Sequence, residues 1–529
     1  MARSLALAAT LVASLLAVSG AGGATAQTPK RGGTVVIQRG LGLPTCLNPL
    51  REECDVFWAF QALEGAFEPG PFTFRPNLVS GVDFTRRPPF VLTYHIRPEA
   101  RWSDGVPVTA SDFVFTYQAI RKYASPDDLH RRYIQSVRVV DAKTLRVVLR
   151  SRFAGYRDFF DRVLPRHALR GEDLATIWID RMDNPKTGQP IGSGPFLIQS
   201  LDRDKQVVLV RNGRYWGPHR AYLDRIVVRL DLLGSEAIFG ALRRGELDVF
   251  QAFARTREEQ DELRQLPGVS LLARPGATME HLLIRVGEGG HPALRNKLVR
   301  RALAFGIDRE ALARTHGNDA ARLESMLFPS RSPYYRPNWN VYRYRPAEAR
   351  RMLEQAGCRR GADGIYVCSG ERLSLRLTTV PRPDRTLTVE LTQTQLRRIG
   401  VEVRPEYADS VVLTRQILPA GNVELALFSW SYGPTSSGFV DLFGCGGPLN
   451  FYGYCQRLVT ADLDQADRIF DLGQRARVLN RADATMAKDV PLLPLYNPAD
   501  VAAVRSSIRG FEQGWPFNLW HAENWWLDR

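Results

Sequence analysis

The sequence LALFSWSYGP, residues 425–434, has the pattern of a short buried strand that runs into a loop. Its first four residues are apolar, and the Gly-Pro pair at its end marks a turn. Trp430 and Tyr432 lie where the predicted strand ends, a position from which aromatic rings can stack on a bound molecule. The same rings could serve as ordinary core or edge side chains. The stretch therefore indicates either the wall of a ligand site or part of a core.

Residues 1–26 have the pattern of an export signal. Arg3 supplies a positive start, Leu5 to Val18 an apolar segment, and Ala24-Thr25-Ala26 a small-residue cleavage site. The absence of a cysteine near this site disfavours a lipid-anchored lipoprotein, and no later stretch approaches the roughly twenty apolar residues of a spanning helix. We expect an exported protein, periplasmic or extracellular, that is soluble after cleavage.

Length and charge restrict the class of protein. A chain of 529 residues exceeds one hydrophobic core and suggests roughly three domains. The formal net charge is +15, and of the 71 basic residues only seven are lysine. The arginines alternate with acidic residues instead of forming one tract, which favours a solvated surface over a nucleic-acid site. An anionic partner or a membrane surface is compatible with this charge but is not indicated by its distribution.

Six cysteines fit an oxidising compartment. They contain no C-x-x-C motif and no accompanying histidine cluster, which disfavours zinc and thioredoxin-type chemistry. Six cysteines allow fifteen pairings. Proximity along the chain favours three local bridges, each contributing roughly 2–3 kcal/mol by restraining a loop. The pairs would be Cys46 with Cys54, Cys358 with Cys368, and Cys445 with Cys455.

The sequence carries no recognisable catalytic motif. It lacks a G-x-S-x-G elbow, H-E-x-x-H, a Walker A sequence and a G-x-G-x-x-G fingerprint. The eight histidines are scattered without metal-ligand spacing, and no carboxylate pair is singled out as a dyad. We therefore expect no enzyme activity, no cofactor and no metal site.

Helices and short strands alternate along the chain, which is typical of α/β lobes. Thr109 and Asp112 resemble a capping box before a helix whose Phe113, Tyr117 and Ile120 share one apolar face. Further strands are expected at 90–96, 207–210 and 226–230, and further helices at 235–244, 298–314, from Pro346 to Gly357, and 387–399.

Seven motifs in a fixed order resemble the family 5 solute-binding proteins, the extracytoplasmic receptors of peptide, dipeptide and nickel ABC importers. Each motif is weak alone, whereas the ordered set extends from about residue 32 to the C-terminus. The motifs are WSDGVPVTASDFVF (102–115), GSGPF (192–196), NGRYW (212–216), YLDRI (222–226), GELDV (245–249), VRRALAFGIDR (299–309) and PLLPLY (491–496).

The resemblance implies a two-lobed periplasmic-binding-protein fold with a double-crossover hinge and an extra subdomain in the first lobe. The first lobe would comprise residues 30–50, 191–272 and 491–529, with the subdomain at 51–190 and the second lobe at 273–490. The crossovers would lie near 274–284 and 491–496. Ligand would be enclosed between the lobes and delivered to the transmembrane subunits of a permease by a monomeric receptor.

In peptide-binding members of the family, an Asp in a Trp-x-x-Asp-Tyr-x-Asp-Pro motif binds the peptide amino group. Trp430 matches the Trp of this motif, but Gly433 stands where that Asp is expected. An enclosed ammonium without a partner carries a desolvation cost of several kcal/mol. Asp441 could substitute from a shifted position, or it could face solvent or cap a helix. The ligand is therefore either a peptide held without this salt bridge or another solute, such as a sugar, a metal chelate or an amphipathic molecule.

The expected ligand contacts are of three kinds: stacking surfaces, a hydroxyl, and groups of the first loop. Arg415 could meet a ligand carboxylate or be a surface arginine. The set is Trp430, Tyr432 and Gly433 in the loop of residues 425–434, Tyr496 for the hydroxyl, Leu43 and Thr45 for backbone groups, and Arg415. Two other functions remain open, a secreted sensor that is not coupled to transport and an exported hydrolase on this scaffold.

Overall fold

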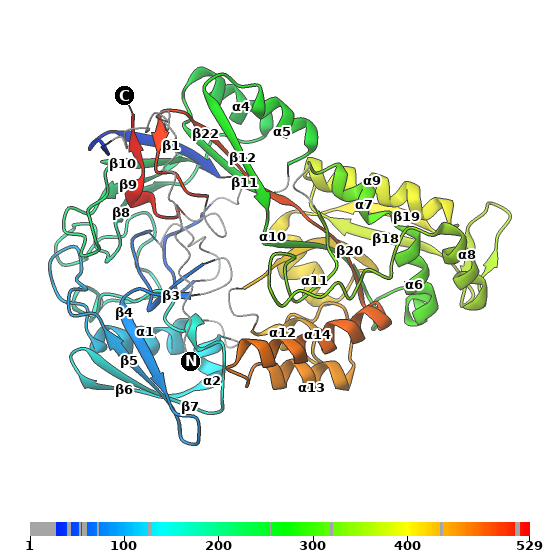
Figure 1. The fold of residues 1–529 in the computed structure, drawn as a ribbon, viewed down its shortest axis with the longest axis horizontal. Helices are drawn as coiled ribbons and strands as arrows, with labels where there is room; N and C mark the ends of the chain where they lie inside the picture. The colour runs from blue at the N-terminus through cyan, green and yellow to red at the C-terminus, as the bar shows by residue number, and fades with distance from the viewer. Residues whose placement is uncertain are drawn as a thin grey trace, which may run out of the picture.

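Two large sheets, one in each half of the molecule, organise the fold (Figure 1). The computed structural model describes residues 28–39, 44–51, 54, 61–70, 74–124, 128–253, 255–317, 321–433, 437–513 and 519–528. We call the half that contains the seven-stranded and four-stranded sheets the first lobe, and the half with the six-stranded sheet the second lobe. The mixed α/β architecture agrees with the expected fold class.

The seven-stranded sheet of the first lobe has the order β12-β22-β11-β1-β10-β9-β8. Strand β1 (Thr34–Arg39) is central and runs parallel to both neighbours, whereas the outer pairs are antiparallel. The buried side chains of Val35 and Ile37 fix β1 in the core. The other strands are β8 (Phe196–Asp202), β9 (Gln206–Arg211), β10 (Arg225–Arg229), β11 (Val249–Phe253), β12 (Val269–Pro275) and β22 (Ala499–Arg505), and the accompanying helices are α4 (Ser235–Arg244) and α5 (Arg257–Arg264).

A four-stranded antiparallel sheet, of order β4-β5-β7-β6, forms the lower part of the first lobe (Figure 1). Helix α1 (Ala110–Tyr123) packs on it, and the predicted capping box is present because Asp112 accepts a hydrogen bond of 2.8 Å from the Thr109 N–H. Phe113, Tyr117 and Ile120 are buried as expected. The other elements are β2 (Phe67–Pro69), β3 (Phe74–Pro76), β4 (Val79–Phe84), β5 (Phe90–Ile96), β6 (Ile134–Asp141), β7 (Thr144–Leu149), α2 (Leu129–Tyr133), η2 (Tyr156–Asp158) and α3 (Arg166–Leu169).

The second lobe is built on a sheet of order β14-β21-β13-β20-β18-β19. The stretch LALFSWSYGP contributes its strand β20 (Leu425–Ser431), which pairs antiparallel with β13 (Thr278–Ile284) and parallel with β18 (Ser374–Thr379). All seven residues of β13 are buried. The other strands are β14 (Ala321–Arg322), β19 (Glu402–Tyr407) and β21 (Leu492–Asn497), with the small strands β15 (Arg359–Arg360), β16 (Tyr366–Cys368) and β17 (Glu371–Arg372) in a separate sheet.

The helix predicted over residues 298–314 is wrong in one respect, since the structure has two helices there. Helix α6 (Lys297–Gly306) ends because Ile307 is extended, and Asp308 then caps α7 (Arg309–Arg314) by accepting from the Ala311 N–H at 2.9 Å. The other helices of this lobe are α8 (Pro346–Gln355), α9 (Pro383–Arg398), α10 (Ser410–Val412), α11 (Leu418–Ala420), α12 (Phe439–Phe443), α13 (Arg457–Ala466) and α14 (Leu472–Asp489), with η3 (Pro292–Arg295) and η4 (Leu413–Ile417).

Two crossovers connect the lobes, β12 to β13 and β21 to β22. They lie side by side, because the Gly276 N–H donates to the Pro498 carbonyl at 3.1 Å and the Asn497 amide donates to the Thr278 carbonyl at 2.7 Å. A Cβ at Gly276 would lie 2.4 Å from the Pro498 oxygen, so the close approach requires glycine. Strand β21 pairs with β13 and so belongs to the second sheet, which corrects the expectation that all of residues 491–529 lie in the first lobe. The remaining lobe boundaries stay a prediction.

The three local disulfides are confirmed. The Cα–Cα distances are 4.8 Å for Cys46–Cys54, 4.3 Å for Cys358–Cys368 and 4.4 Å for Cys445–Cys455. Near the C-terminus, β23 (Ile508–Arg509) pairs with β24 (Trp526–Leu527), and η5 (Ala522–Asn524) precedes β24. Among the described residues, none of the helices has the length and apolar character that crossing a membrane requires.

Candidate ligand-binding site

Trp430 lies at the end of β20, and a relay of hydrogen bonds fixes its ring. Its Nε1–H donates to the Tyr452 hydroxyl at 2.9 Å, and the indole stacks on Phe451 at 6.0 Å with an interplanar angle of 22°. The Tyr452 hydroxyl lies 2.8 Å from Nε2 of His281, whose Nδ1 faces the Met279 carbonyl at 3.1 Å. Burial lowers the pKa of His281 to about 4, so the imidazole is neutral and accepts from Tyr452. Half-buried Trp430 is thus held in one orientation before any ligand arrives.

Tyr432 and Tyr496 lie inside the second lobe. Tyr432 is 3% exposed and donates its hydroxyl to the Ser325 carbonyl at 2.8 Å. Tyr496 is fully buried, with its hydroxyl 2.9 Å from Thr388 Oγ1 and its ring stacked on His316 at 4.3 Å. Both hydroxyls already have protein partners, so these rings support the strands that carry the site. Their predicted contact with ligand stays a prediction.

The remaining predicted residues are dispersed. Gly433 is exposed, and a Cβ there would meet no atom of the described residues within 4 Å. Thr45 is exposed beside the Cys46–Cys54 bridge, and Arg415 is exposed on η4. Leu43 lies outside the described residues. The roles assigned to these four residues also stay predictions.

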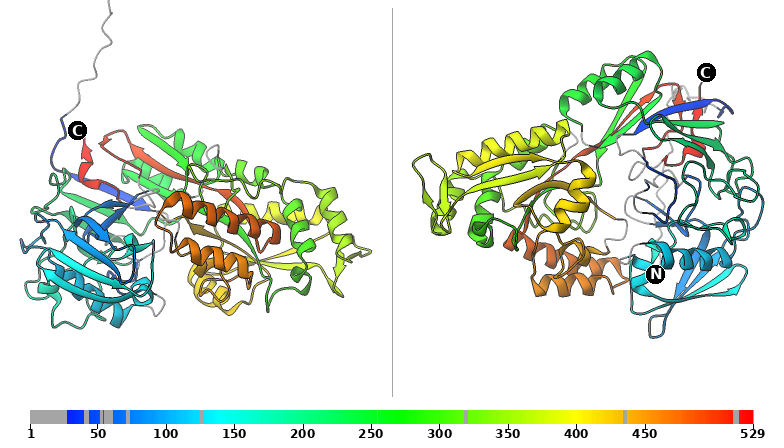
Figure 2. Two further views of the ribbon diagram at one scale, coloured as in Figure 1. Left: turned by 60° about the horizontal axis from the view of Figure 1, so that its bottom comes forward. Right: turned by 180° about the vertical axis from the view of Figure 1, so that it is seen from behind.

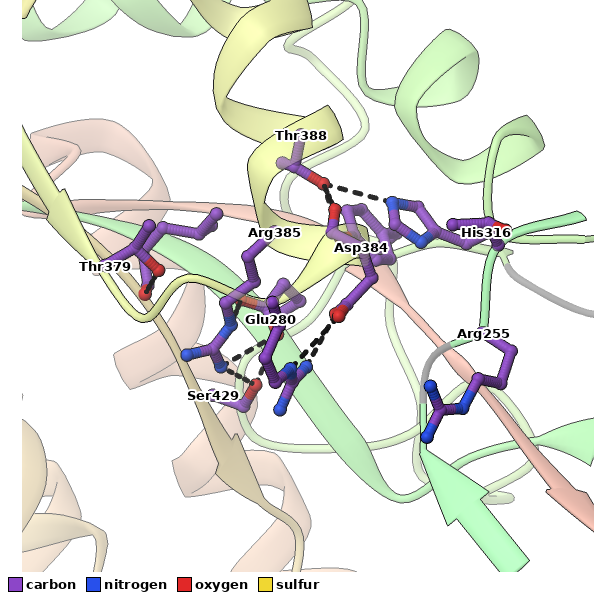
Figure 3. Close-up of polar contacts among 12 residues, drawn as sticks. Arg255, Glu280, His316, Thr379, Asp384, Arg385, Thr388 and Ser429 are labelled. Carbon is purple, nitrogen blue, oxygen red and sulfur yellow. Dashed lines mark hydrogen bonds and ion pairs between the residues drawn. The ribbon is translucent and has the colours of Figure 1, made fainter. Parts of the chain in front are cut away.

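A buried charged cluster lies at the end of the second sheet near the crossovers (Figure 3). Glu280 of β13 is 1% exposed, and its Oε1 lies 3.2 Å from Nε of Arg385, at the start of α9. Arg385 also donates to Ser429 Oγ of β20 at 2.9 Å, and Ser429 in turn donates to Glu280. Because each charge has a partner, burial does not leave an isolated ion. We call Glu280, Arg385 and Ser429 the charged triad.

A second ion pair adjoins the charged triad. Arg382 contacts both carboxylate oxygens of Asp384, at 3.0 and 2.6 Å. Burial alone would raise the pKa of Asp384, but the positive charges of Arg382 and Arg385 outweigh it and lower the pKa. From the first lobe, Arg255 lies across from these groups (Figure 3), held by Glu259 at 3.3 Å. The junction of the lobes is therefore lined by fixed, mutually compensated charges.

The lobes also touch at the edge opposite the crossovers, where α12 to α14 meet the four-stranded part of the first lobe (Figure 2). Arg132 of α2 forms an ion pair with Asp441 of α12, so Asp441 faces the other lobe. The ring of Phe470 stacks on Phe84 at 4.7 Å, and the Ala154 N–H donates to the Asp467 carbonyl at 2.7 Å. We call these contacts the edge contact. Together with the crossovers, they close the molecule on two sides of the junction.

Sequence reasoning missed the charged triad and the edge contact. Glu280 and Arg385 are 105 positions apart, and Arg132 and Asp441 are 309 apart. Glu280, Arg385 and Arg132 looked like many other charged residues in an arginine-rich chain. Asp441 was considered as a ligand contact, a solvent-facing residue or a helix cap, and its ion pair with Arg132 was not foreseen. Among the described residues, no group of three or more His, Cys, Asp or Glu side chains is arranged to hold a metal ion.

Two lobes joined by paired crossovers, with fixed aromatic and charged groups at their junction, define the class of hinged solute receptors. Residues 73–450 match the family described as "Bacterial extracellular solute-binding proteins, family 5 Middle". The match covers more than half of the chain, so the protein belongs to family 5 of the bacterial extracellular solute-binding proteins. It is a binding receptor, and its family is a non-enzymatic one.

Relatives and solved structures agree with this assignment. The oligopeptide-binding protein OppA of Mycobacterium tuberculosis (strain H37Rv) is 28% identical over 466 residues, covering 84% of this chain and 75% of that protein. The oligopeptide-binding protein AppA of Bacillus subtilis is 24% identical over 455 residues, 82% and 80% of the two chains. The fold is similar to that of the periplasmic EDTA-binding protein EppA, with TM-score 0.83, 21% identity and coverage of 95% and 98%. AppA of Bacillus subtilis in complex with a nonapeptide gives TM-score 0.81, 21% identity and coverage of 95% and 100%.

Proposed function

We propose that the protein captures an oligopeptide-like or other amphipathic solute between its lobes and delivers it to the transmembrane subunits of an ABC importer. The observation that carries this proposal is the junction itself, where Trp430 and the charged triad lie beside paired crossovers. The names of OppA and AppA, both oligopeptide-binding proteins, support a peptide-like ligand.

Stacking on Trp430 is the main anchor of the proposed ligand. The indole is pre-oriented by Tyr452 and Phe451, so binding costs little side-chain entropy. Gly433 supplies no carboxylate for an ammonium group. Glu280, on the same sheet as Trp430, has a buried carboxylate, but this carboxylate is already paired with Arg385. The ligand is therefore one that does not depend on a salt bridge to a free α-amine.

The test starts from the molecules that co-purify with the mature protein, identified by native mass spectrometry. Matched peptides with a free or an acetylated amino terminus are then titrated by calorimetry. We expect similar affinities for the two forms and a loss of about tenfold in Trp430→Ala, which is about 1.4 kcal/mol of stacking. Tyr407→Ala, an exposed aromatic on strand β19 of the same sheet, is the control and should bind normally.

Two outcomes would contradict the proposal. A strong preference for the free amine would show that an ammonium site exists after all. Unchanged affinity in Trp430→Ala would remove the stacking role. Transport is tested separately, because uptake of the identified solute must require both this receptor and a permease, whereas a sensor would bind without supporting uptake.

Export and oligomeric state belong to the same proposal. Removal of residues 1–26 would leave a mature chain that begins at Gln27, which intact-mass measurement of the exported protein can verify. Light scattering after gel filtration should give the mass of a monomer.

A further inference from the structure

A cavity of about 540 Å³ lies within the first lobe and contains none of the junction residues. Its wall comes from the chain around β2, from the loop after β9, and from the segment before β24. The wall includes the aromatic side chains of Trp216, Trp520 and Tyr215. Trp216 is fixed because its Nε1–H donates to Glu64 at 2.9 Å and to the Ser193 carbonyl at 3.0 Å.

The charged groups around this cavity are predominantly acidic. Arg97 is compensated by Glu99 at 3.5 Å, and His521 by Glu523 at 3.1 Å. Two further carboxyl groups of the wall, those of Glu64 and Glu68, form no ion pair with any described residue. A positively charged guest beside these groups would favour their carboxylate forms.

Gln61 gives a second, independent indication. Its side chain belongs to the wall and is only 8% exposed, and its Oε1 has no hydrogen-bond partner among the residues that the structure describes. Buried amide oxygens in native proteins almost always accept a hydrogen bond. This unpaired acceptor has almost no surface open to the cavity, so a guest reaches it only after a small movement of the wall.

We propose that this cavity binds a small organic cation, an amine with an apolar body, whose ammonium faces Glu64 and Glu68 while its body packs on Trp216 and Trp520. Carboxylates and the faces of indole rings both attract a cation, and the rings also cover the apolar part of the guest. The proposal does not rest on the function of the junction between the lobes.

Binding of such a cation is coupled to the protonation of Glu64. Burial raises the pKa of Glu64 to about 8, despite the hydrogen bonds from Tyr215 and Trp216, and the nearby charges of Glu68 and Glu523 act in the same direction. The other ionisable groups of the wall are Asp161, Arg97, Glu99 and His521. A bound ammonium favours the carboxylate form, so binding should release a proton and strengthen as the pH rises from 6 toward the pKa of about 8.

The experiment uses phenethylamine as the cationic probe and 2-phenylethanol as its uncharged match, both titrated into the mature protein by calorimetry. We expect saturable one-to-one binding of the amine only, with proton release detected as a dependence on the ionisation enthalpy of the buffer. Glu68→Gln should weaken binding about tenfold. The control Glu172→Gln, an exposed acid of the same lobe, should bind normally.

Trp430→Ala separates this cavity from the junction, because it should leave phenethylamine binding unchanged. Loss of binding in that variant would overturn the proposal by placing the amine between the lobes. Equal affinity for 2-phenylethanol, no saturable binding of the amine at millimolar concentration, or unchanged binding in a folded Glu68→Gln variant would also overturn it.

Discussion

Arg309 is buried to 2% exposure, and its guanidinium connects three segments of the second lobe. Nη1 donates to the carbonyls of Leu323 and Pro494 at 2.7 and 3.0 Å, and Nη2 donates to those of Trp339 and Tyr342, both at 2.9 Å. Arginine is the only residue whose side chain, a planar guanidinium with several N–H donors, can donate to four carbonyls in these directions. Pro494 lies in β21, so Arg309 also stabilises the strand that leads into the second crossover.

Replacement of this side chain by lysine, Arg309→Lys, should reduce the free energy of unfolding by about 2–4 kcal/mol. Lysine offers three donors from one atom, which leaves at least one buried carbonyl without a partner. Urea unfolding followed by circular dichroism measures the loss. Arg314→Lys, an exposed residue of α7, is the matched control, and an equal effect in both variants would refute the role of Arg309.

Gly433→Asp should restore recognition of a free amino terminus. The new Cβ meets no atom of the described residues within 4 Å, and Gly433 is exposed, so the described surroundings leave room for the side chain. A carboxylate beside Trp430 would attract an ammonium group, and we expect peptides with a free amine to bind about tenfold more tightly than in the native protein. Calorimetry with the acetylated peptide is the control. If both peptides gain equally, the added charge does not act on the amine.

Helices α12 to α14 and the turns between them form the second-lobe side of the edge contact. Phe470, between α13 and α14, stacks on Phe84 and also lies 5.1 Å from the Arg152 guanidinium. These contacts are separate from the crossovers, so they stabilise only the arrangement in which the lobes touch. A ligand that binds the closed arrangement therefore benefits from them.

Phe470→Ala should weaken ligand binding several-fold without greatly changing thermal stability. The aromatic pair contributes about 0.5–1.5 kcal/mol to closure, and that energy is lost from the apparent binding energy. Calorimetry gives the affinity, and small-angle X-ray scattering gives the more open shape of the variant. Exchange of the Arg132–Asp441 charges provides a second check. Arg132→Asp alone should weaken binding, whereas its combination with Asp441→Arg should recover it. Unchanged affinity in Phe470→Ala would show that the edge contact does not contribute to closure.

Three buried carboxyl groups in different parts of the molecule make its stability depend on pH. Burial raises the pKa of Glu64 to about 8, and those of Asp467 and Asp500 to about 7. In the unfolded chain these groups titrate near pH 4, so above that value the folded state holds more protons. Stability therefore falls as the pH rises toward the folded pKa values.

Buried histidine has the opposite effect at lower pH. Burial lowers the pKa of His281 to about 4, so the unfolded chain binds a proton below about pH 6.5 that the folded state does not. The two effects oppose each other between about pH 4 and 6.5. Above about pH 6.5 the carboxyl groups continue to titrate, and His521, whose pKa is raised by its hydrogen bond to Glu523, acts in the same direction because the folded state again holds the extra proton.

We expect the melting temperature to decrease between about pH 6.5 and 8 at constant ionic strength, since the buried acids lose protons there that the folded state had retained. Calorimetric melting across this range measures the trend. The combined variant Glu64→Gln, Asp467→Asn and Asp500→Asn should give a flatter profile. A melting temperature that rises with pH in the native protein would refute the assignment of these groups.

Local patterns in the sequence determined the α/β class, the family, the capping of α1 and the three disulfide pairs. Each depends on residues close together in the chain, or on motifs in a fixed order. The disulfides were predictable because cysteines separated by 8 or 10 positions can meet whatever the rest of the chain does.

The surroundings of LALFSWSYGP were decided only by the tertiary structure. The sequence placed Trp430 and Tyr432 together as possible ligand contacts. However, β20 ends at Ser431, and the structure directs Trp430 toward Tyr452 and buries Tyr432, beyond the end of the strand, against Ser325. The charged triad depends on the register of β13 against β20 and on the position of α9, which join residues up to 149 positions apart. Register and helix packing are long-range properties, because the free energy of burying whole faces selects them and no local spacing encodes them.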